Sequence, residues 1–176
     1  MSVSTQAFLL DGAIVAREIK EKVKTEIATS GFVPCLAAIR VGDDPASMVY
    51  VRNKIQACAE VGIRSESHEL PATTTTDELL NLIKSLNSRH DVDGILTQLP
   101  LPSGLDENVV IEEIDPIKDV DGFHPINVGR LALGRPQLVP CTPAGVIELL
   151  DHYQIDIRGT NACIVGRSQI VGRPMA

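Results

Sequence analysis

Short apolar runs recur along this chain, and segments with helical periodicity separate them. Cys35–Ile39 is a continuous apolar run, and Val92–Leu96 is a second short strand candidate. A run of this length without polar alternation is typical of a parallel strand covered on both faces. Ile63–Leu70 is more polar and is predicted to be an edge strand. Strands that alternate with helices in this way predict a parallel, doubly wound α/β sheet in three layers.

Helix-end signals mark the segments between these strands. Asp44 is placed to cap a helix, and Pro45 is placed at its first position. Thr75-x-x-Glu78 forms a capping box before another apolar stripe. The predicted strands Cys35–Ile39 and Ile63–Leu70 are therefore each followed by a helix, which returns the chain to the edge of the sheet where the strand began. The predicted helices cover Ala13–Ser30, Pro45 to about Gly62, Asp77 to about Leu86, Asn108–Ile114 and Val146–His152.

Composition excludes several classes of function. The 176 residues carry a formal net charge of −7 with three Phe, two Tyr and no Trp, whereas a nucleic-acid groove needs a basic face and stacking aromatic side chains. No apolar run approaches the roughly 20 residues that span a bilayer. We therefore expect a soluble protein whose partners are small molecules or other proteins, and we place it in the cytoplasm because its cysteines are typical of free thiols in a reducing compartment. The four cysteines lack a C-x-x-C pair and are predicted to be buried free thiols: Cys35, Cys58, Cys141 and Cys163.

A second structural unit begins near the end of the chain. We divide the sequence into a first domain over residues 1–141 and a second unit over residues 142–176. The second unit holds a helix, a predicted strand at Asn161–Val165 and the turn Gly166-x-Ser168-x-x-x-Gly172. This turn departs from the G-x-G-x-x-G pattern, but its place between a strand and a helix would direct N–H groups toward a dinucleotide phosphate. We expect this Rossmann-type unit to be truncated, because such a fold needs several more strands.

One helix face presents an aromatic ring and an amine together. Ser47, Tyr50, Lys54 and Cys58 follow each other at offsets of three, four and four residues, so their side chains share one stripe. From the residues alone, the favoured interpretation is that Tyr50 is a packing residue and Lys54 a solvated charge, since most such pairs are ordinary. Cys58 has no base nearby in the sequence and is predicted to belong to the core. Gln98 follows a strand, which places it at the edge where open α/β folds bind ligands, although a plain turn residue is an equal alternative.

The polar loop Asp115-Pro-Ile-Lys-Asp-Val-Asp-Gly-Phe-His-Pro125 is dense in residues of restricted geometry, which is typical of a loop that holds a ligand. Its acids do not fit a calcium loop. If Gly122 were the sixth position of such a loop, the first and twelfth would be Ile117 and Val128, which cannot bind calcium. We therefore predict no metal. The remaining alternative is that the acids are solvated loop residues, and His124 is predicted to have a structural role.

Three motifs in order resemble one family, the methylenetetrahydrofolate dehydrogenase/methenyltetrahydrofolate cyclohydrolases: Gln98–Pro102, the loop Asp115–Pro125 and Pro140–Pro143. The resemblance implies that the ring of Tyr50 lies over the fused ring of a folate and that Lys54 transfers protons. It also implies that Gln98 contacts Lys54 and the one-carbon unit, and that Asp121 accepts an adjacent N–H and amine of the pterin. The further substrate-binding residues that it implies are Ser47, Leu99 and Pro100, and the cofactor-binding residues are Gly166, Arg167, Ser168, Ile170 and Gly172.

The same resemblance implies two reactions at one folate site. 5,10-Methylenetetrahydrofolate is oxidised to the 5,10-methenyl cation, and water then opens the ring to give 10-formyltetrahydrofolate. Arg167 near the adenosine ribose favours NADP over NAD. The family resemblance further implies a homodimer and a place in one-carbon metabolism that supplies purine biosynthesis. We expect the 176-residue chain to lack dehydrogenase activity while retaining hydrolysis if its first domain folds alone.

Two other functions compete with this interpretation. A phosphorelay receiver domain also alternates strands with helices, and Asp43-Asp44 imitates its acidic pair. That class requires a phosphoacceptor aspartate where this chain has Thr97-Gln98. The second alternative is a non-catalytic remnant that binds folate or another subunit without the cofactor half.

Overall fold

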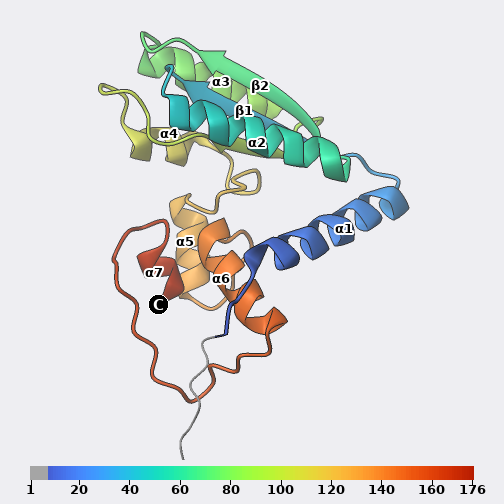
Figure 1. Cartoon of the computed structure of the whole chain (residues 1–176). Coiled ribbons are helices and arrows are strands. Elements are labelled where there is room, and N and C mark those ends of the chain that lie inside the picture. Colours follow the sequence, from blue (N-terminus) through green and yellow to red (C-terminus); the bar gives the residue numbers. More distant parts are fainter. Residues whose placement is uncertain (1–7) are drawn as a thin grey trace, which may run out of the picture.

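A three-stranded parallel sheet in the order β2–β1–β3 organises the computed structural model, which describes residues 8–176 (Figure 1). The strands are β1 (Cys35–Val41), β2 (Arg64–Leu70) and β3 (Gly94–Thr97). The register pairs Ile39 of β1 with His68 of β2 and with Thr97 of β3. The predicted parallel sheet and the predicted edge strand are therefore confirmed, and the carboxyl ends of β1 and β3 meet at one edge.

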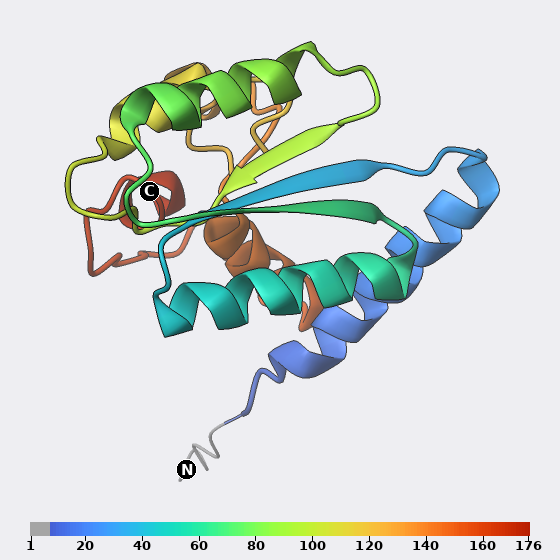
Figure 2. The ribbon, with the colours of Figure 1, turned by 90° about the horizontal axis from the view of Figure 1, so that it is seen from above.

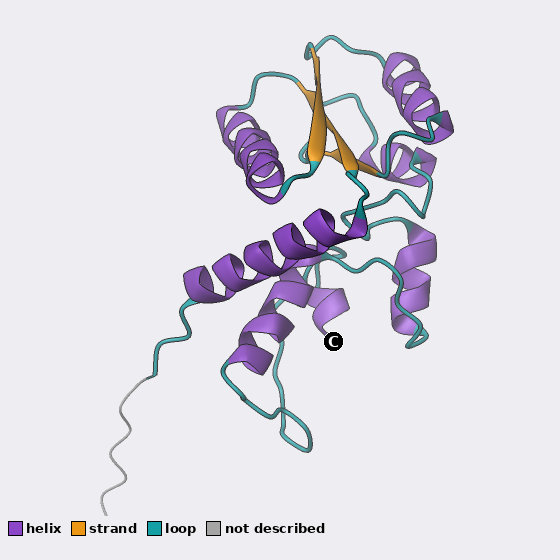
Figure 3. Ribbon diagram, turned by 90° about the vertical axis from the view of Figure 1, so that its right-hand side faces the viewer, coloured by secondary structure: helices purple, strands orange, loops and turns teal. Residues whose placement is uncertain are grey.

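Helices cover both faces of this sheet, as the prediction of three layers requires (Figures 2 and 3). α3 and α4 lie on one face, α2 lies on the other, and α1 continues from the α2 side toward α5, α6 and α7. The helices are α1 (Gly12–Ser30), α2 (Pro45–Val61), α3 (Thr76–Ser88), α4 (Glu107–Glu113), α5 (Pro125–Ala132), α6 (Cys141–His152) and α7 (Gly172–Met175). Within the described residues, no helix is both long and apolar enough to cross a membrane.

Local capping explains where the main helices begin. The Asp44 carboxylate accepts a hydrogen bond of 2.7 Å from the N–H of Ser47, and Pro45 occupies the first position of α2. Thr75 and Glu78 form the predicted capping box at the start of α3. These predictions are confirmed, because each rests on contacts between residues close in the sequence.

The hydrophobic core lies between the sheet and the α3–α4 layer. Ile39 and Ile95 from the strands pack with Leu79, Ile83 and Val110 from the helices, and all five are fully buried. Each buried aliphatic side chain of this size contributes roughly 1.5–3 kcal/mol relative to an exposed one. This core fixes the two strand ends from which the site is built.

Two of the sequence expectations about buried segments are wrong. Asn161–Val165 forms no strand, and Val165 is 98% exposed. A strand needs a hydrogen-bonded neighbour, and none of the three strands among residues 8–176 pairs with this segment. Cys35 and Cys58 are buried free thiols as predicted, but Cys141 and Cys163 are exposed. Cys141 begins α6, whereas Cys163 lies in the unpaired segment.

The sequence pattern does not predict the helix α5, because Pro125 also fits the end of the polar loop that begins at Asp115. His124 caps this helix, since its Nδ1 accepts the N–H of Ile126 at 3.1 Å, and Pro125 stands at the first helical position. The predicted structural role of His124 is thus confirmed. A proline after a polar capping residue was the signal that could have revealed the helix.

The turn at Gly122 is expected to tolerate no side chain. Its φ is +69°, and a Cβ would lie 2.6 Å from the carbonyl carbon of Val139. We expect Gly122→Ala to lower the free energy of unfolding by about 3 kcal/mol, because left-handed strain of roughly 1–2 kcal/mol adds to a backbone clash. Urea unfolding measures the loss. Gly134→Ala is the matched control, since Gly134 has a φ of +67° with nothing within 4 Å of the Cβ. An equal loss in both variants would contradict the clash.

An ion-pair network joins β2 to the segment after α3, at the end of the sheet opposite to the strand carboxyl ends. Arg89 donates to Glu66 at 2.8 Å and to Asp91 at 2.7 Å, and Arg64 donates to Glu66 at 2.7 Å. These guanidinium groups hold the pKa of Glu66 below its ordinary value, and the hydrogen bonds from Arg89 have the largest effect.

This network predicts a pH-dependent stability. Because the folded-state pKa of Glu66 is lowered, its contribution is present above the ordinary glutamate pKa of about 4.3 and is lost as the pH falls through the folded value. We expect Glu66→Gln to cost roughly 1–2 kcal/mol at pH 7 and progressively less below about pH 4. Thermal unfolding at several pH values measures the difference. Asp156→Asn is the control at an exposed ion pair with Arg158, and a constant difference for Glu66→Gln across the pH range would contradict the assignment.

Candidate active site

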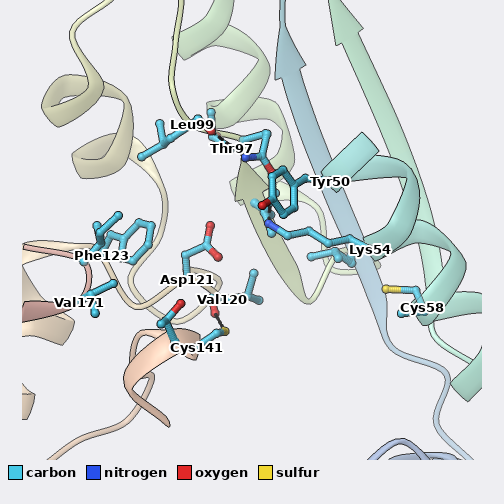
Figure 4. A pocket seen from close by; sticks show the side chains of 16 residues that line it. Tyr50, Lys54, Cys58, Thr97, Leu99, Val120, Asp121, Phe123, Cys141 and Val171 are labelled. Carbon is cyan, nitrogen blue, oxygen red and sulfur yellow. Dashed lines mark hydrogen bonds between the residues drawn. The ribbon is translucent and has the colours of Figure 1, made fainter. Parts of the chain in front are cut away.

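A cavity of about 640 Å³ opens at the carboxyl end of β3 (Figure 4). Its walls come from α2, the end of β3, the loop around Asp121, the start of α6 and the turn before α7. Tyr50, Lys54 and Asp121 are expected to face one ligand, and all three line this cavity. Its other lining residues include Thr97, Gln98, Leu99, Val120, Phe123, Cys141, Thr142, Ile170 and Val171.

Tyr50 and Lys54 lie one helical turn apart on α2. The ring of Tyr50 is 61% exposed, so its face is available at the mouth of the cavity. The Lys54 amine donates a hydrogen bond of 3.3 Å to Oε1 of Gln98, and Nε2 of Gln98 donates to the carbonyl of Leu99 at 2.7 Å. This second bond fixes which end of the Gln98 amide faces the lysine. The expected contact between Gln98 and Lys54 is therefore present.

Asp121 directs its carboxylate into the open space of the cavity (Figure 4). Burial raises the pKa of this carboxyl, the Lys54 ammonium acts in the opposite direction, and Asp119 raises it further. The carboxylate makes no hydrogen bond or ion pair with the residues that the structure describes, so its two oxygens are free to accept. A half-buried, unpaired acceptor in a concave site is suited to binding polar N–H groups of a ligand.

Asp119 has a different task from Asp121, although the two acids are only two residues apart. Asp119 is 3% exposed, and its Oδ2 accepts hydrogen bonds of 2.9 Å from the N–H of His124 and from Nδ2 of Asn127. It ties the loop to the start of α5. No group of three or more His, Cys, Asp or Glu side chains within residues 8–176 could hold a metal ion.

The glycine-rich turn before α7 is closed on itself. Oγ of Ser168 accepts hydrogen bonds of 3.1 Å from the N–H groups of Val171 and Gly172. A Cβ on Gly172 would lie 2.5 Å from the backbone of Gly166, so only glycine allows this approach. Because Ser168 uses its oxygen as the acceptor, its hydroxyl proton remains available for an anion beside the turn.

The predicted site residues do not all reach the cavity. Ser47 is 4% exposed and contributes its N–H to the Asp44 cap, and Pro100 is exposed beside Leu99 without lining the cavity. All five predicted cofactor residues lie in the glycine-rich turn that leads into α7: Gly166, Arg167, Ser168, Ile170 and Gly172. Of these five, Ile170 lines the cavity.

Several lining residues were not predicted as site residues. Phe123 lies within the polar loop, and Cys141 and Thr142 lie within the motif Pro140–Pro143. The sequence indicates both motifs as parts of the site, but their spacing alone does not reveal which side chains face inward. Cys58 also borders the cavity, where burial raises the pKa of its thiol.

These features define an open parallel α/β protein with a ligand cavity at the carboxyl edge of its sheet, beside a glycine-rich turn. The catalytic-domain model of the tetrahydrofolate dehydrogenase/cyclohydrolase family matches residues 10–121, and the model of its NAD(P)-binding domain matches residues 140–176. The chain belongs to this family, and the resemblance inferred from its motifs is confirmed.

Relatives and solved structures agree with this assignment. The chain is 54% identical over 172 residues to the bifunctional protein FolD of Oleidesulfovibrio alaskensis, covering 96% of this chain and 60% of that protein. The FolD structure from Campylobacter jejuni superposes with a TM-score of 0.93 at 50% identity and covers 96% of this chain and 61% of that one. A Trypanosoma brucei FolD, solved with NADP and an inhibitor, gives a TM-score of 0.91 at 36% identity, covering 97% and 60%. The chain thus spans about 60% of the length of these relatives.

Proposed function

We propose that this chain acts in one-carbon folate metabolism. Its site serves the oxidation of 5,10-methylenetetrahydrofolate to the 5,10-methenyl form with a nicotinamide cofactor, and the hydrolysis of that product to 10-formyltetrahydrofolate. The observation that carries the proposal is the convergence of Tyr50, Lys54 and Asp121 on one cavity, with Lys54 hydrogen-bonded to Gln98. Family membership supports the same reactions.

The cavity offers complementary groups for the two ends of a folate head group. The Asp121 carboxylate accepts the ring N–H and the exocyclic amine of the pterin in a bidentate manner. Tyr50 stacks on the fused ring, and Leu99 packs against it. This arrangement leaves the one-carbon unit on the side of Lys54 and Gln98.

Lys54 carries the proton transfers of the hydrolytic reaction. Water must lose protons as it attacks the methenyl carbon, and a ring nitrogen must gain one as the ring opens. Of the side chains that α2 contributes to the cavity, Lys54 carries the amine that serves this task, and Gln98 holds it in place through the 3.3 Å hydrogen bond. Gln98 is itself fixed by the carbonyl of Leu99.

The turn between Gly166 and Gly172 fits a dinucleotide phosphate. The close approach at Gly172 leaves no room for a side chain, and Ser168 keeps a hydroxyl proton to donate. When bound, the nicotinamide accepts the hydride. Ile170 of this turn lines the cavity and would orient the ring against the folate. We further propose NADP rather than NAD, because the exposed guanidinium of Arg167 suits a 2′-phosphate.

We further propose how the chain is organised in the cell. Residues 1–141 form the folate-binding catalytic domain, and residues 142–176 form a connecting helix and the beginning of a dinucleotide-binding domain. The protein works as a cytoplasmic homodimer whose product supplies purine biosynthesis.

One series of assays tests both activities. Loss of the absorbance of 5,10-methenyltetrahydrofolate is followed without nucleotide, and the formation of that absorbance from 5,10-methylenetetrahydrofolate is then followed with NADP and with NAD. We expect ring opening without nucleotide and little oxidation by the 176-residue chain, and any oxidation that is measured should be faster with NADP than with NAD. A protein that binds tetrahydrofolate but accelerates neither reaction would instead support the non-catalytic alternative.

A further inference from the structure

Lys118 lies in the polar loop Asp115–Pro125, three residues before Asp121. Its ammonium group contacts the C-terminal end of α3. Its Nζ donates hydrogen bonds to the carbonyls of Leu86, Asn87 and Arg89, at 3.1, 2.9 and 2.6 Å. These carbonyls stand at the C-terminal end of α3, where helical carbonyls lack partners within the helix. An ammonium has three donors, so all of them are used, and its charge lies at the negative end of the helix dipole.

The backbone around Lys118 is fixed as firmly as its side chain. Its carbonyl accepts a hydrogen bond of 2.7 Å from the N–H of Ile95 in β3, and its N–H donates to the carbonyl of Asp115 at 2.8 Å. Asn87 adds a further link, because its Oδ1 accepts the N–H of Asp115 at 3.0 Å. Residue 118 therefore joins the loop to β3 through the backbone and to α3 through the side chain.

Asp121 depends on such anchors for its position. Its carboxylate has no hydrogen-bond or ion-pair partner among residues 8–176, so the backbone of the loop sets where the side chain starts and which way it leaves the chain. On one side, Asp119 ties the loop to α5 through His124 and Asn127. On the other side, Lys118 ties the loop to α3. A loss of either anchor would leave the ligand-binding carboxylate free to move.

We propose that Lys118 is a positioning residue for the folate site, which holds Asp121 where the N–H groups of the pterin meet it. This role rests on the proposed function of the cavity. Lys118 does not touch the ligand, and it acts through the loop that it fixes to the end of α3. Its substitution is therefore expected to affect binding of the pterin more than the proton transfers at Lys54.

A double-mutant cycle separates this role from a general loosening of the fold. Lys118→Met removes the three donors and keeps an unbranched side chain. We expect the Kd for tetrahydrofolate to rise about tenfold, while kcat for ring opening at saturation changes less than about twofold. In an Asp121→Asn background, the same substitution should leave Kd unchanged, because the two residues act on one interaction. Lys84→Met is the matched control, because Lys84 is an exposed lysine of α3, the helix that Lys118 contacts. This substitution should not change Kd.

Equal increases in Kd in both backgrounds, or no increase in the first, would overturn the proposal. If Lys118→Met does not fold, Lys118→Arg replaces it, because the guanidinium keeps the charge but cannot reproduce three bonds from one nitrogen. For Lys118→Arg we expect Kd to rise by less than the tenfold expected for Lys118→Met, and to stay unchanged in the Asp121→Asn background. An equal rise in both backgrounds would overturn the proposal.

Amide hydrogen exchange in the ligand-free protein adds a test that needs no folate. Faster exchange at residues 119–122 of Lys118→Met, with β1 unchanged, is the expected result. Unchanged exchange at residues 119–122 would contradict the proposal that Lys118 holds the loop in place. A wild-type protein that does not bind tetrahydrofolate would contradict the proposed function itself, and with it the role of Lys118 toward a pterin, whatever the exchange rates.

Discussion

Lys54→Met is expected to lower the rate of methenyltetrahydrofolate ring opening by about 10²–10⁴-fold, which is the usual contribution of a general acid–base group. Methionine keeps the length of the side chain but can neither accept nor donate the proton, and it also loses the hydrogen bond to Gln98. Folate binding should remain measurable, because Tyr50 and Asp121 are unchanged. The decay of methenyl absorbance, with a parallel measurement of Kd, separates the two effects.

Lys24→Met is a suitable control for this experiment. Lys24 is exposed on α1, so the control makes the same chemical change away from the cavity. Its rate should match that of the wild type. If Lys54→Met opened the ring at the wild-type rate, another group would have to move the protons, and the proposed mechanism would be wrong.

Asp121→Asn is expected to weaken tetrahydrofolate binding by about 10–100-fold. The carboxylate offers two acceptor oxygens to two N–H groups, whereas an amide offers one acceptor and places a donor against a donor. The loss of one charge-assisted hydrogen bond is worth about 1.5–3 kcal/mol, which corresponds to this range of affinity. Isothermal titration calorimetry gives the Kd directly.

The control for this variant is Asp151→Asn on α6, which makes the same change of charge at an exposed position. It should leave the affinity unaltered. An affinity of Asp121→Asn equal to that of the wild type would rule out the bidentate contact, even if the ligand still occupied the cavity.

The sequence predicted those parts of the fold that depend on local chemistry. Asp44 before Pro45 identified the start of α2, and Thr75 with Glu78 identified the start of α3, because a cap is decided by residues within one turn of each other. Asn161–Val165 looked equally like a strand, but a strand exists only with a neighbour, which a local pattern cannot supply.

The candidate site could be predicted in part for a similar reason. Helical spacing placed Tyr50 beside Lys54, and the family resemblance added Asp121 and Gln98 to them. The sequence could not distinguish the buried anchor Asp119 from the open acceptor Asp121, because the difference arises from contacts of Asp119 with His124 and Asn127 in three dimensions. Nor could it indicate that Lys118 reaches the end of α3.

A crystal structure of the protein with bound tetrahydrofolate shows whether Tyr50, Lys54 and Asp121 bind one pterin together. We expect the pterin in the 640 Å³ cavity, with its ring against Tyr50, its N–H groups on the Asp121 carboxylate and its one-carbon nitrogens facing Lys54. Folate bound elsewhere, for example in the smaller cavity beside Arg40 and Glu69, would contradict it.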